Sequence, residues 1–313
     1  MELIPGTISS PFGIATADEF YALKDTDTTG LYYELTADID LTSVEGYEPF
    51  EFKGILIGNN KTITPSANGI FSVLNIAEVS DFTIATAEVS GNAALAYEAY
   101  GSRISGIVNN ASVTSTAANT AAFVGKSNNS KVTITNCINN GDVESVEGNV
   151  GGFIGWSANG GAEIISGINN GDIKGSSSIG GFVGYNTQQL TVTDSINTGN
   201  VVSFGSTHAA GTSGGILGAQ RQDASVRTAT ITGCYNSGIV SAKADFEGYG
   251  RYNPIMPQLY DNIAVITVSD CYYLAVNPET DLDAYEGTTA LALDDFKAKD
   301  TRLADLTFVT VTM

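Results

Sequence analysis

Apolar and polar positions recur along the chain with a period of about 30 residues, and an Asn-centred pattern marks each repeat. The anchors of this pattern are Asn109, Asn139, Asn169, Asn197 and Asn236. They are separated by 139 − 109 = 30, 169 − 139 = 30, 197 − 169 = 28 and 236 − 197 = 39 residues. A β-branched apolar residue precedes each anchor by five positions, and another follows it by four. This agreement predicts one supersecondary unit stacked on copies of itself.

A second pattern, Gly-Gly-Phe or a close variant, precedes the anchors by 139 − 123 = 16, 169 − 153 = 16, 197 − 182 = 15 and 236 − 216 = 20 residues. Each repeat therefore holds three β segments: the Gly-Gly-Phe strand, a strand that leads into Asn, and a strand that follows Gly-Asp-Val. Val, Ile and Thr fill these segments, and Asn and Gly separate them. The pattern predicts an all-β fold, a parallel β-helix with three β segments per coil.

Stacking of the coils predicts how the repeated residues meet. Each strand would pair with the same strand of the next coil, about 4.8 Å away. The Asn anchors would then form a ladder inside a tight corner, with side-chain amides bonded along the helix axis.

Short helices are expected at both ends, where a β-helix must cover its open edges. Residues 1–30 form the predicted N-terminal cap, in which Thr16 and Glu19 have the spacing of a capping box. Residues 31–274 hold the coils, and residues 275–313 form a C-terminal helical cap and tail, with a helix over 291–306. The whole chain is expected to be a single domain.

The charge balance narrows the range of partners. With 14 Lys and Arg against 34 Asp and Glu, the formal net charge is −20. Nucleic acids and anionic lipid surfaces call for basic patches, so neither is expected as a partner. No apolar run is long enough to span a membrane, and Met1–Gly6 shows no secretory leader pattern.

The three cysteines, Cys137, Cys234 and Cys271, lack the spacing of a metal site. Cys137 and Cys234 occupy the slot two residues before the anchor, which elsewhere accepts Ile, Gly or Ser. Such a slot is typical of an inward packing position, so we expect buried free thiols and no disulfide.

The repeats Gly151-Gly152-Phe153-Ile154-Gly155 and Asn139-Asn140-Gly141-Asp142-Val143 resemble the GLUG-motif repeats of bacterial surface proteins. The opening segment 33–41 and the closing Tyr272-Tyr273-Leu274 resemble the same group, so the similarity covers roughly residues 14–305. The resemblance implies a right-handed parallel β-helix exported to the cell surface, commonly in gut Bacteroidetes. Members are mostly described as adhesins or are uncharacterised, and the group carries no agreed catalytic residues. Some members belong to IgA-peptidase-like chains, but the zinc-protease motif His-Glu-x-x-His is absent here.

The acidic residues Asp142, Asp172 and Asp194 are the first candidates for chemistry. Asp142 and Asp172 occupy equivalent positions in successive coils, where two carboxylates could bind Ca²⁺ or act as an acid–base pair on a polysaccharide. The alternative is a pair of solvated turn residues, since Asn200 replaces them in the next coil. His208 is the only histidine, and it lies in a Gly/Ser/Thr-rich insertion without an evident partner.

Aromatic residues are the candidates for binding. Trp156 and Tyr185 each lie three residues after the Phe of their strand, so they would stand side by side on adjacent coils. Facing outward, they would make a platform for a sugar ring or a partner chain; facing inward, they would belong to the core.

A second aromatic group lies in the interruption of the repeat at 243–262. Its candidate ligand-binding residues are Phe246, Tyr249, Arg251, Tyr252 and Tyr260. Long loops on a rigid scaffold often carry recognition, and Tyr and Arg are favoured contact residues. The alternative is an aromatic loop that folds over the coils and covers core.

The function favoured by these observations is a non-catalytic, exported adhesion or recognition module at the outer cell surface. Its expected partner is an extracellular glycan or a host or bacterial surface protein, with no cofactor apart from Ca²⁺ at the acidic pair. The alternatives are a polysaccharide lyase or glycoside hydrolase built on a β-helix, and a structural stalk.

Overall fold

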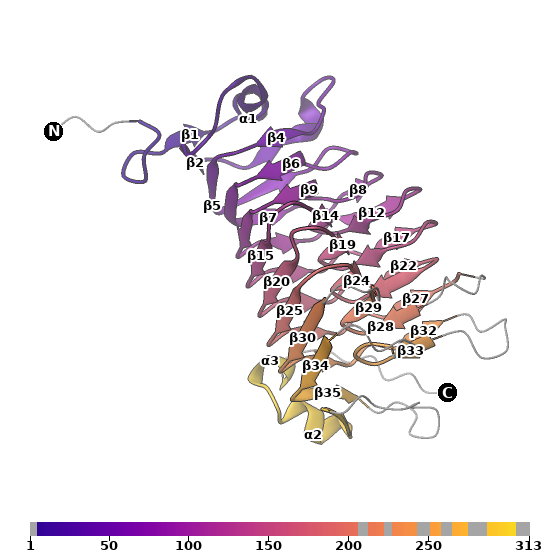
Figure 1. Ribbon diagram of the computed structural model, residues 1–313. Coiled ribbons are helices and arrows are strands. Elements are labelled where there is room, and N and C mark those ends of the chain that lie inside the picture. Colours follow the sequence, from indigo (N-terminus) through magenta and orange to yellow (C-terminus); the bar gives the residue numbers. More distant parts are fainter. Residues whose placement is uncertain are drawn as a thin grey trace.

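The computed structural model describes residues 5–205, 212–221, 227–242, 251–257, 265–274 and 287–304. Short strands wind through successive coils into a parallel β-helix, and strands of equivalent position pair from coil to coil in four walls (Figure 1). All pairings between the named strands are parallel, as the repeat predicted.

The four walls are defined by their strands. The long wall contains β1 (Phe12–Ile14), β2 (Tyr32–Leu35), β3 (Ile39–Asp40), β5 (Ile55–Thr64), β7 (Glu78–Ile84), β10 (Arg103–Ser105), β11 (Val108–Asn109), β15 (Val132–Thr135), β16 (Ile138–Asn139), β20 (Ala162–Ile165), β21 (Ile168–Asn169), β25 (Leu190–Thr193), β26 (Ile196–Asn197), β30 (Thr228–Thr232), β31 (Tyr235–Asn236), β34 (Val265–Ser269), β35 (Cys271–Leu274) and β36 (Thr288–Leu291). The aromatic wall contains β4 (Phe50–Phe52), β6 (Phe71–Asn75), β9 (Ala96–Tyr100), β14 (Val124–Ser127), β19 (Ile154–Ser157), β24 (Val183–Asn186) and β29 (Leu217–Gln220). The acidic wall contains β8 (Glu88–Val89), β12 (Ser112–Ser115), β17 (Val143–Ser145), β22 (Ile173–Gly175), β27 (Val201–Ser203) and β32 (Val240–Ala242). The short wall contains β13 (Thr120–Ala121), β18 (Val150–Gly151), β23 (Ser178–Gly180), β28 (Thr212–Gly214) and β33 (Arg251–Asn253).

Each of the three predicted segments is present in the repeating coils. The Gly-Gly-Phe segment leads into the aromatic wall, the segment before Asn lies in the long wall, and the segment after Gly-Asp lies in the acidic wall. The structure subdivides the coil further, because a strand of the short wall precedes each Phe. A left-handed residue such as Asn136, with φ 54°, also splits the long-wall segment.

Like residues face each other in register between coils. Asn139 pairs with Asn169 in the long wall, and Val143 pairs with Ile173 in the acidic wall. A slip of one residue would turn every buried side chain toward solvent, so the buried apolar face fixes this register.

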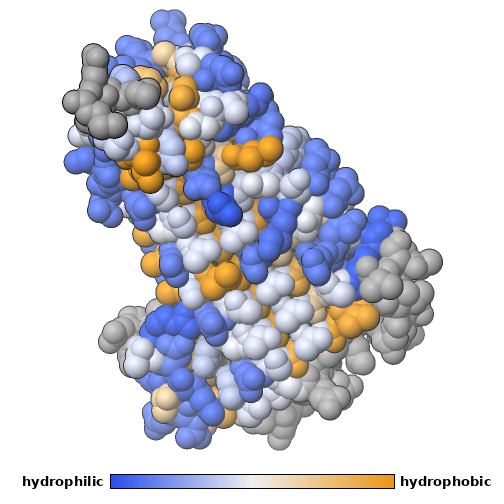
Figure 2. Space-filling model, turned by 60° about the vertical axis from the view of Figure 1, so that its left-hand side comes forward, coloured by the Kyte–Doolittle hydropathy of each residue, from blue (hydrophilic) through white to orange (hydrophobic). Residues whose placement is uncertain are grey.

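Aromatic rings fill the interior of the middle coils. Phe123, Phe153 and Phe182 are fully buried and stack along the axis, with ring centroids 4.9 Å and 4.7 Å apart. On the outside of the long wall, apolar side chains form small separate groups among hydrophilic ones (Figure 2).

The predicted Asn ladder is confirmed. The Nδ2 of each buried anchor but the last donates to the Oδ1 of the anchor in the next coil, at distances of 2.8, 2.8, 2.7 and 2.7 Å along the series Asn109, Asn139, Asn169, Asn197 and Asn236. The same Nδ2 also donates to the backbone carbonyl two residues later, for example from Asn169 to Gly171 at 2.9 Å. The ladder therefore provides hydrogen-bond partners for the buried side-chain amides and for the backbone carbonyls of the surrounding corner.

A short helix begins the fold as predicted. Helix α1 (Ala17–Tyr21) is preceded by Thr16, whose hydroxyl accepts from the Glu19 amide in a complete capping box. Its buried Phe20 packs against Phe50 and Phe71 of the first aromatic-wall strands. Two short 3-10 helices, η1 (Ala22–Asp25) and η2 (Leu41–Ser43), follow it.

The C-terminal region differs from the single helix expected over 291–306. Two helices, α2 (Leu293–Lys297) and α3 (Thr301–Ala304), lie at the end of the solenoid (Figure 1). Their buried Phe296 and Leu303 pack against Ile196 and Tyr235, in a cluster separate from the interior core. The second helix starts anew after Asp300, whose Oδ1 accepts the backbone N–H of Arg302 at 2.9 Å as an N-terminal cap does. None of the helices in the described part of the chain is long and apolar enough to cross a membrane.

The three cysteines are buried, as expected from their slot, and none is bonded to another in the structure. Burial raises the pKa of the Cys137 thiol to about 12. An interior thiol of this kind is unreactive while the coil stays closed.

Candidate functional site

The outward face of the aromatic wall brings the predicted Trp156 and Tyr185 together. Strand pairing places Lys126 opposite Trp156 and Trp156 opposite Tyr185, so the three side chains occupy consecutive rungs. All three are partly exposed, whereas the Phe residues three positions earlier are buried. The outward orientation follows from the register, because the apolar Phe must face the core.

Polar contacts hold this aromatic pair in place. The Lys126 Nζ lies 5.0 Å from the centroid of the Trp156 ring and 3.6 Å from the Glu98 Oε1. The Trp156 Nε1 donates to the Thr187 Oγ1 at 3.2 Å. The side chains of Lys126 and Glu98 are only 20% and 17% exposed, so this ion pair is less screened by water than a typical surface pair. We call Glu98, Lys126, Trp156, Tyr185 and Thr187 the wall ledge.

Sequence reasoning missed Glu98, although its position within the repeat indicates that it lies beside Lys126. Glu98 lies three residues after Leu95, which takes the place of the Phe in a divergent copy of the repeat. The Tyr100 hydroxyl donates to the Glu98 carboxylate, and this hydrogen bond raises the pKa of Tyr100 to about 12. Tyr97 on the same strand is 42% exposed, so the aromatic character of the wall extends beyond the predicted pair.

The second predicted aromatic group does not join the wall ledge as far as the structure describes it. Arg251 and Tyr252 belong to β33 of the short wall, paired with Thr212 and Ser213. The segment expected as a loop therefore contains a regular strand, because the coil closes again after its insertion. Phe246, Tyr249, Tyr260 and the single His208 lie outside the described residues.

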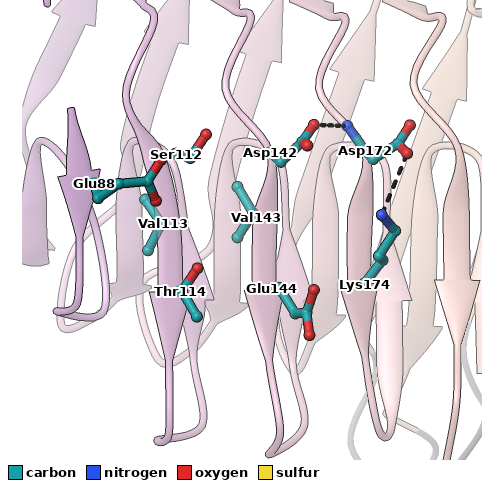
Figure 3. A pocket seen from close by; sticks show the side chains of 9 residues that line it. All are labelled: Glu88, Ser112, Val113, Thr114, Asp142, Val143, Glu144, Asp172 and Lys174. Carbon is teal, nitrogen blue, oxygen red and sulfur yellow. Dashed lines mark hydrogen bonds and ion pairs between the residues drawn. The ribbon is translucent and has the colours of Figure 1, made fainter. Parts of the chain in front are cut away.

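A shallow groove of about 200 Å³ lies on the outward face of the acidic wall (Figure 3). Its lining residues are Glu88, Ser112, Val113, Thr114, Asp142, Val143, Glu144, Asp172 and Lys174. The structure thus brings the two predicted carboxylates into one groove. Asp194 lies elsewhere, at a left-handed corner of the long wall with φ 50°.

Asp142 and Asp172 hold the coil turns. The Asp142 Oδ1 accepts the backbone N–H of Asp172 at 2.8 Å, and the Asp172 Oδ1 accepts the backbone N–H of Asn200 at 2.9 Å. The remaining Asp172 Oδ2 lies 3.4 Å from the Lys174 Nζ (Figure 3). Each acid therefore bonds to the residue at its own position in the next coil.

These contacts use one oxygen of each carboxylate. Calcium takes about six to eight oxygen ligands, and among the described residues no group of three or more His, Cys, Asp or Glu side chains is arranged to hold a metal. One of the two carboxylates also faces a lysine. Calcium binding at this pair stays a prediction from the sequence.

Replacement of Asp142 tests the turn-holding role. We expect Asp142→Ala to lower the free energy of unfolding by about 1 kcal/mol, because the Asp172 amide loses a charge-assisted acceptor at an exposed site. Asp142→Asn retains an acceptor oxygen and should cost less than half as much. Thermal unfolding with and without added Ca²⁺ measures both effects. A Ca²⁺-dependent rise in Tm that Asp142→Ala abolishes would contradict a purely structural role.

Comparison with known proteins identifies the fold. No protein-family model matches the chain, and no curated protein matches it. Among solved structures, the chain is similar to a candidate immunoglobulin A1 protease from Bacteroides ovatus, with a TM-score of 0.60 and 17% identity over 94% of this chain and 88% of that one. It is also similar to an IgA1 protease, with a TM-score of 0.63 and 18% identity over 96% of this chain. The match covers 25% of that second protein, so a solenoid of this kind is one part of a longer polypeptide there.

Proposed function

We propose that the chain is a non-catalytic recognition module that is displayed at the outer cell surface and binds extracellular glycan through the wall ledge. The observation that carries the proposal is the pairing of Trp156 with Tyr185 on consecutive rungs, both partly exposed on a rigid wall. Export to the cell surface is supported by the resemblance to GLUG-motif surface proteins.

The chemistry of the wall ledge suits a sugar. A pyranose ring presents an apolar face of C–H groups and a rim of hydroxyls. Aromatic side chains combine a flat apolar area with few rotatable bonds, and charged and hydroxyl groups beside them can bond the rim. Trp156 and Tyr185 supply the flat area, and the ion pair of Lys126 and Glu98 supplies polar atoms at its edge.

The backbone contacts of Asp142 and Asp172 support a structural role for these two carboxylates, which favours recognition over catalysis. A glycoside hydrolase needs one protonated carboxyl and one ionised carboxylate that are free to reach the substrate. Asp142 and Asp172 instead accept backbone amides from the following coils. The cleavage assay described below tests the alternative that the chain is a lyase or hydrolase.

A second candidate function follows from the comparisons. The similarity to one part of a much longer IgA1 protease favours a role as an accessory domain within a protease chain. The wall ledge would then contact a protein partner instead of a free glycan. Aromatic residues and well-shielded charges are common in both kinds of interface.

Replacement of Trp156 tests the proposal. We expect Trp156→Ala to weaken retention on a glycan array by about tenfold or more, because a central aromatic contact typically contributes at least this much. Trp156→Phe retains an aromatic face and should retain most of the binding. Glu144→Ala, on the outward face of the acidic wall, is the control and should bind like the unchanged protein.

The same array distinguishes the alternatives. Retention that survives Trp156→Ala would contradict a site at the wall ledge. Release of shortened glycans would favour the lyase or hydrolase reading. Absence of glycan retention together with Trp156-dependent capture of immunoglobulin A would favour the accessory-domain reading.

A further inference from the structure

Cys234 and Cys271 meet in neighbouring coils of the long wall. Thr232 pairs with Ser269 and Tyr235 pairs with Tyr272, so the cysteines between them occupy the same position on adjacent rungs. Both side chains are fully buried. The sequence hid this relation, because the two cysteines are 271 − 234 = 37 residues apart and an interruption of the repeat lies between them.

Inside the solenoid each thiol lies close enough to shift the pKa of the other, and burial followed by the neighbouring Cys271 side chain raises the pKa of Cys234. The Cys271 Sγ lies 3.5 Å from the carbonyl oxygen of Ile231, in the coil that also holds Cys234. The Cys234 Sγ lies 3.6 Å from the carbonyl oxygen of Val192, one coil earlier. Paired strands bring their Cα atoms to roughly 4.8 Å, which lies within the range of about 4.4–6.8 Å that disulfides span.

We propose that Cys234 and Cys271 form a disulfide when the chain folds in an oxidising compartment, and that this bond links two adjacent long-wall rungs near the C-terminal end of the solenoid. The oxidant is a small or protein-borne disulfide. One cysteine thiolate attacks a sulfur of that disulfide and releases one thiol, and the second cysteine thiolate then attacks the mixed bond and releases the other. Two protein thiols are oxidised, the oxidant's disulfide is reduced to two thiols, and the two protons pass to those thiols.

The disulfide forms while the chain is folding and not in the fully folded structure. Burial raises the pKa of the Cys234 thiol, so this thiol forms little thiolate once the coils have closed. Bond formation also requires the Cys234 Sγ to turn from the Val192 carbonyl toward Cys271. Both conditions are met while the terminal coils are assembling.

The bond would stabilise the end of the solenoid, where few later coils contribute pairing. Cys271 begins β35, which pairs with β36, and Tyr272 beside it stacks on Tyr235 at 5.5 Å between ring centroids. Closing a loop of this length in the unfolded chain lowers its conformational entropy. A disulfide at this point therefore stabilises the C-terminal strands on which α2 packs.

Cys137 provides an internal control. Gly167 and Ser195 occupy its slot in the two coils between it and Cys234, so it has no cysteine on an adjacent rung. Its pairing with either of the other cysteines would require the solenoid to unfold or to change register.

The experiment refolds the full chain in a buffer of reduced and oxidised glutathione and counts the remaining thiols by alkylation and intact mass. We expect one thiol in place of three, and a single linked peptide pair that contains Cys234 and Cys271. The oxidised protein should unfold at a higher Tm than the same sample after reduction. Cys137→Ser should still form the link, whereas Cys234→Ser, which copies the residue present at Ser195, should fold without it.

Three free thiols in refolded protein that has regained its native circular dichroism would overturn the proposal. A link that includes Cys137 would overturn it as well. Because Cys234→Ser keeps a residue that this slot already accepts, its folding separates the loss of the bond from a loss of structure.

Discussion

Asn169→Ala is expected to lower the free energy of unfolding by about 3–5 kcal/mol, because it breaks the buried Asn ladder at its centre. Asn169 accepts from the Asn139 Nδ2 at 2.8 Å and donates to the Asn197 Oδ1 at 2.7 Å and the Gly171 carbonyl at 2.9 Å. Alanine leaves these three partners buried with a lost hydrogen bond. Each such group costs about 1–3 kcal/mol in a site that water does not reach.

The neighbouring Asn170 offers a matched control. It belongs to a second, exposed amide ladder, in which its Nδ2 donates to the Asn140 Oδ1 at 2.8 Å. Water replaces these bonds at little cost, so Asn170→Ala should lose less than about 1 kcal/mol. Urea denaturation followed by circular dichroism compares the two variants, with the slope of the transition checked for cooperativity. Equal losses would show that burial is not the source of the ladder's contribution.

Phe153→Ala is expected to cost about 3–5 kcal/mol, the usual range for removing a buried aromatic ring. Phe153 stands between Phe123 and Phe182 in the interior stack, so both ring contacts are lost with one substitution. The backbone of three successive coils is tied by strand pairing, which limits collapse into the cavity. Differential scanning calorimetry should therefore show a clear fall in Tm.

Phe153→Leu is the matched variant, since the chain itself accepts Leu95 and Ile216 at the equivalent positions of other coils. It should cost no more than about half as much as Phe153→Ala, because leucine fills much of the space. A loss for Phe153→Leu as large as that for alanine would mean that the stack depends on ring contacts and not on volume. A loss below about 1 kcal/mol for Phe153→Ala would contradict the stack as a main source of stability.

The repeat alone was enough to predict the buried Asn ladder of this molecule. Equal spacing of like residues specifies which positions meet in the next coil, and one buried face excludes a slipped register. The Asn ladder between Asn139 and Asn169 and the buried Phe153 follow from that rule. The capping box of Thr16 and Glu19 was also predictable, because it depends on residues only three positions apart.

The outward residues were harder to interpret, because solvent imposes no period on them. The sequence paired Trp156 with Tyr185 by register, but the same register was not extended to Glu98, because Leu95 replaces the Phe in that divergent coil. The sequence left Asp142 open as a metal ligand, an acid–base residue or a turn residue, and the structure shows that its Oδ1 accepts the backbone N–H of Asp172 in the next coil.

The chain by itself determined the coil, its register and its buried ladders, because hydrophobic burial and backbone pairing repeat with the same spacing as the residues. Only the tertiary structure determined which residues come into contact when an insertion in the repeat separates them. Cys234 and Cys271 lie on adjacent rungs although an insertion separates them, and Phe296 packs outside the core against Tyr235. Such contacts depend on the position at which the chain rejoins the coils after an irregular segment, and the repeat does not specify that position.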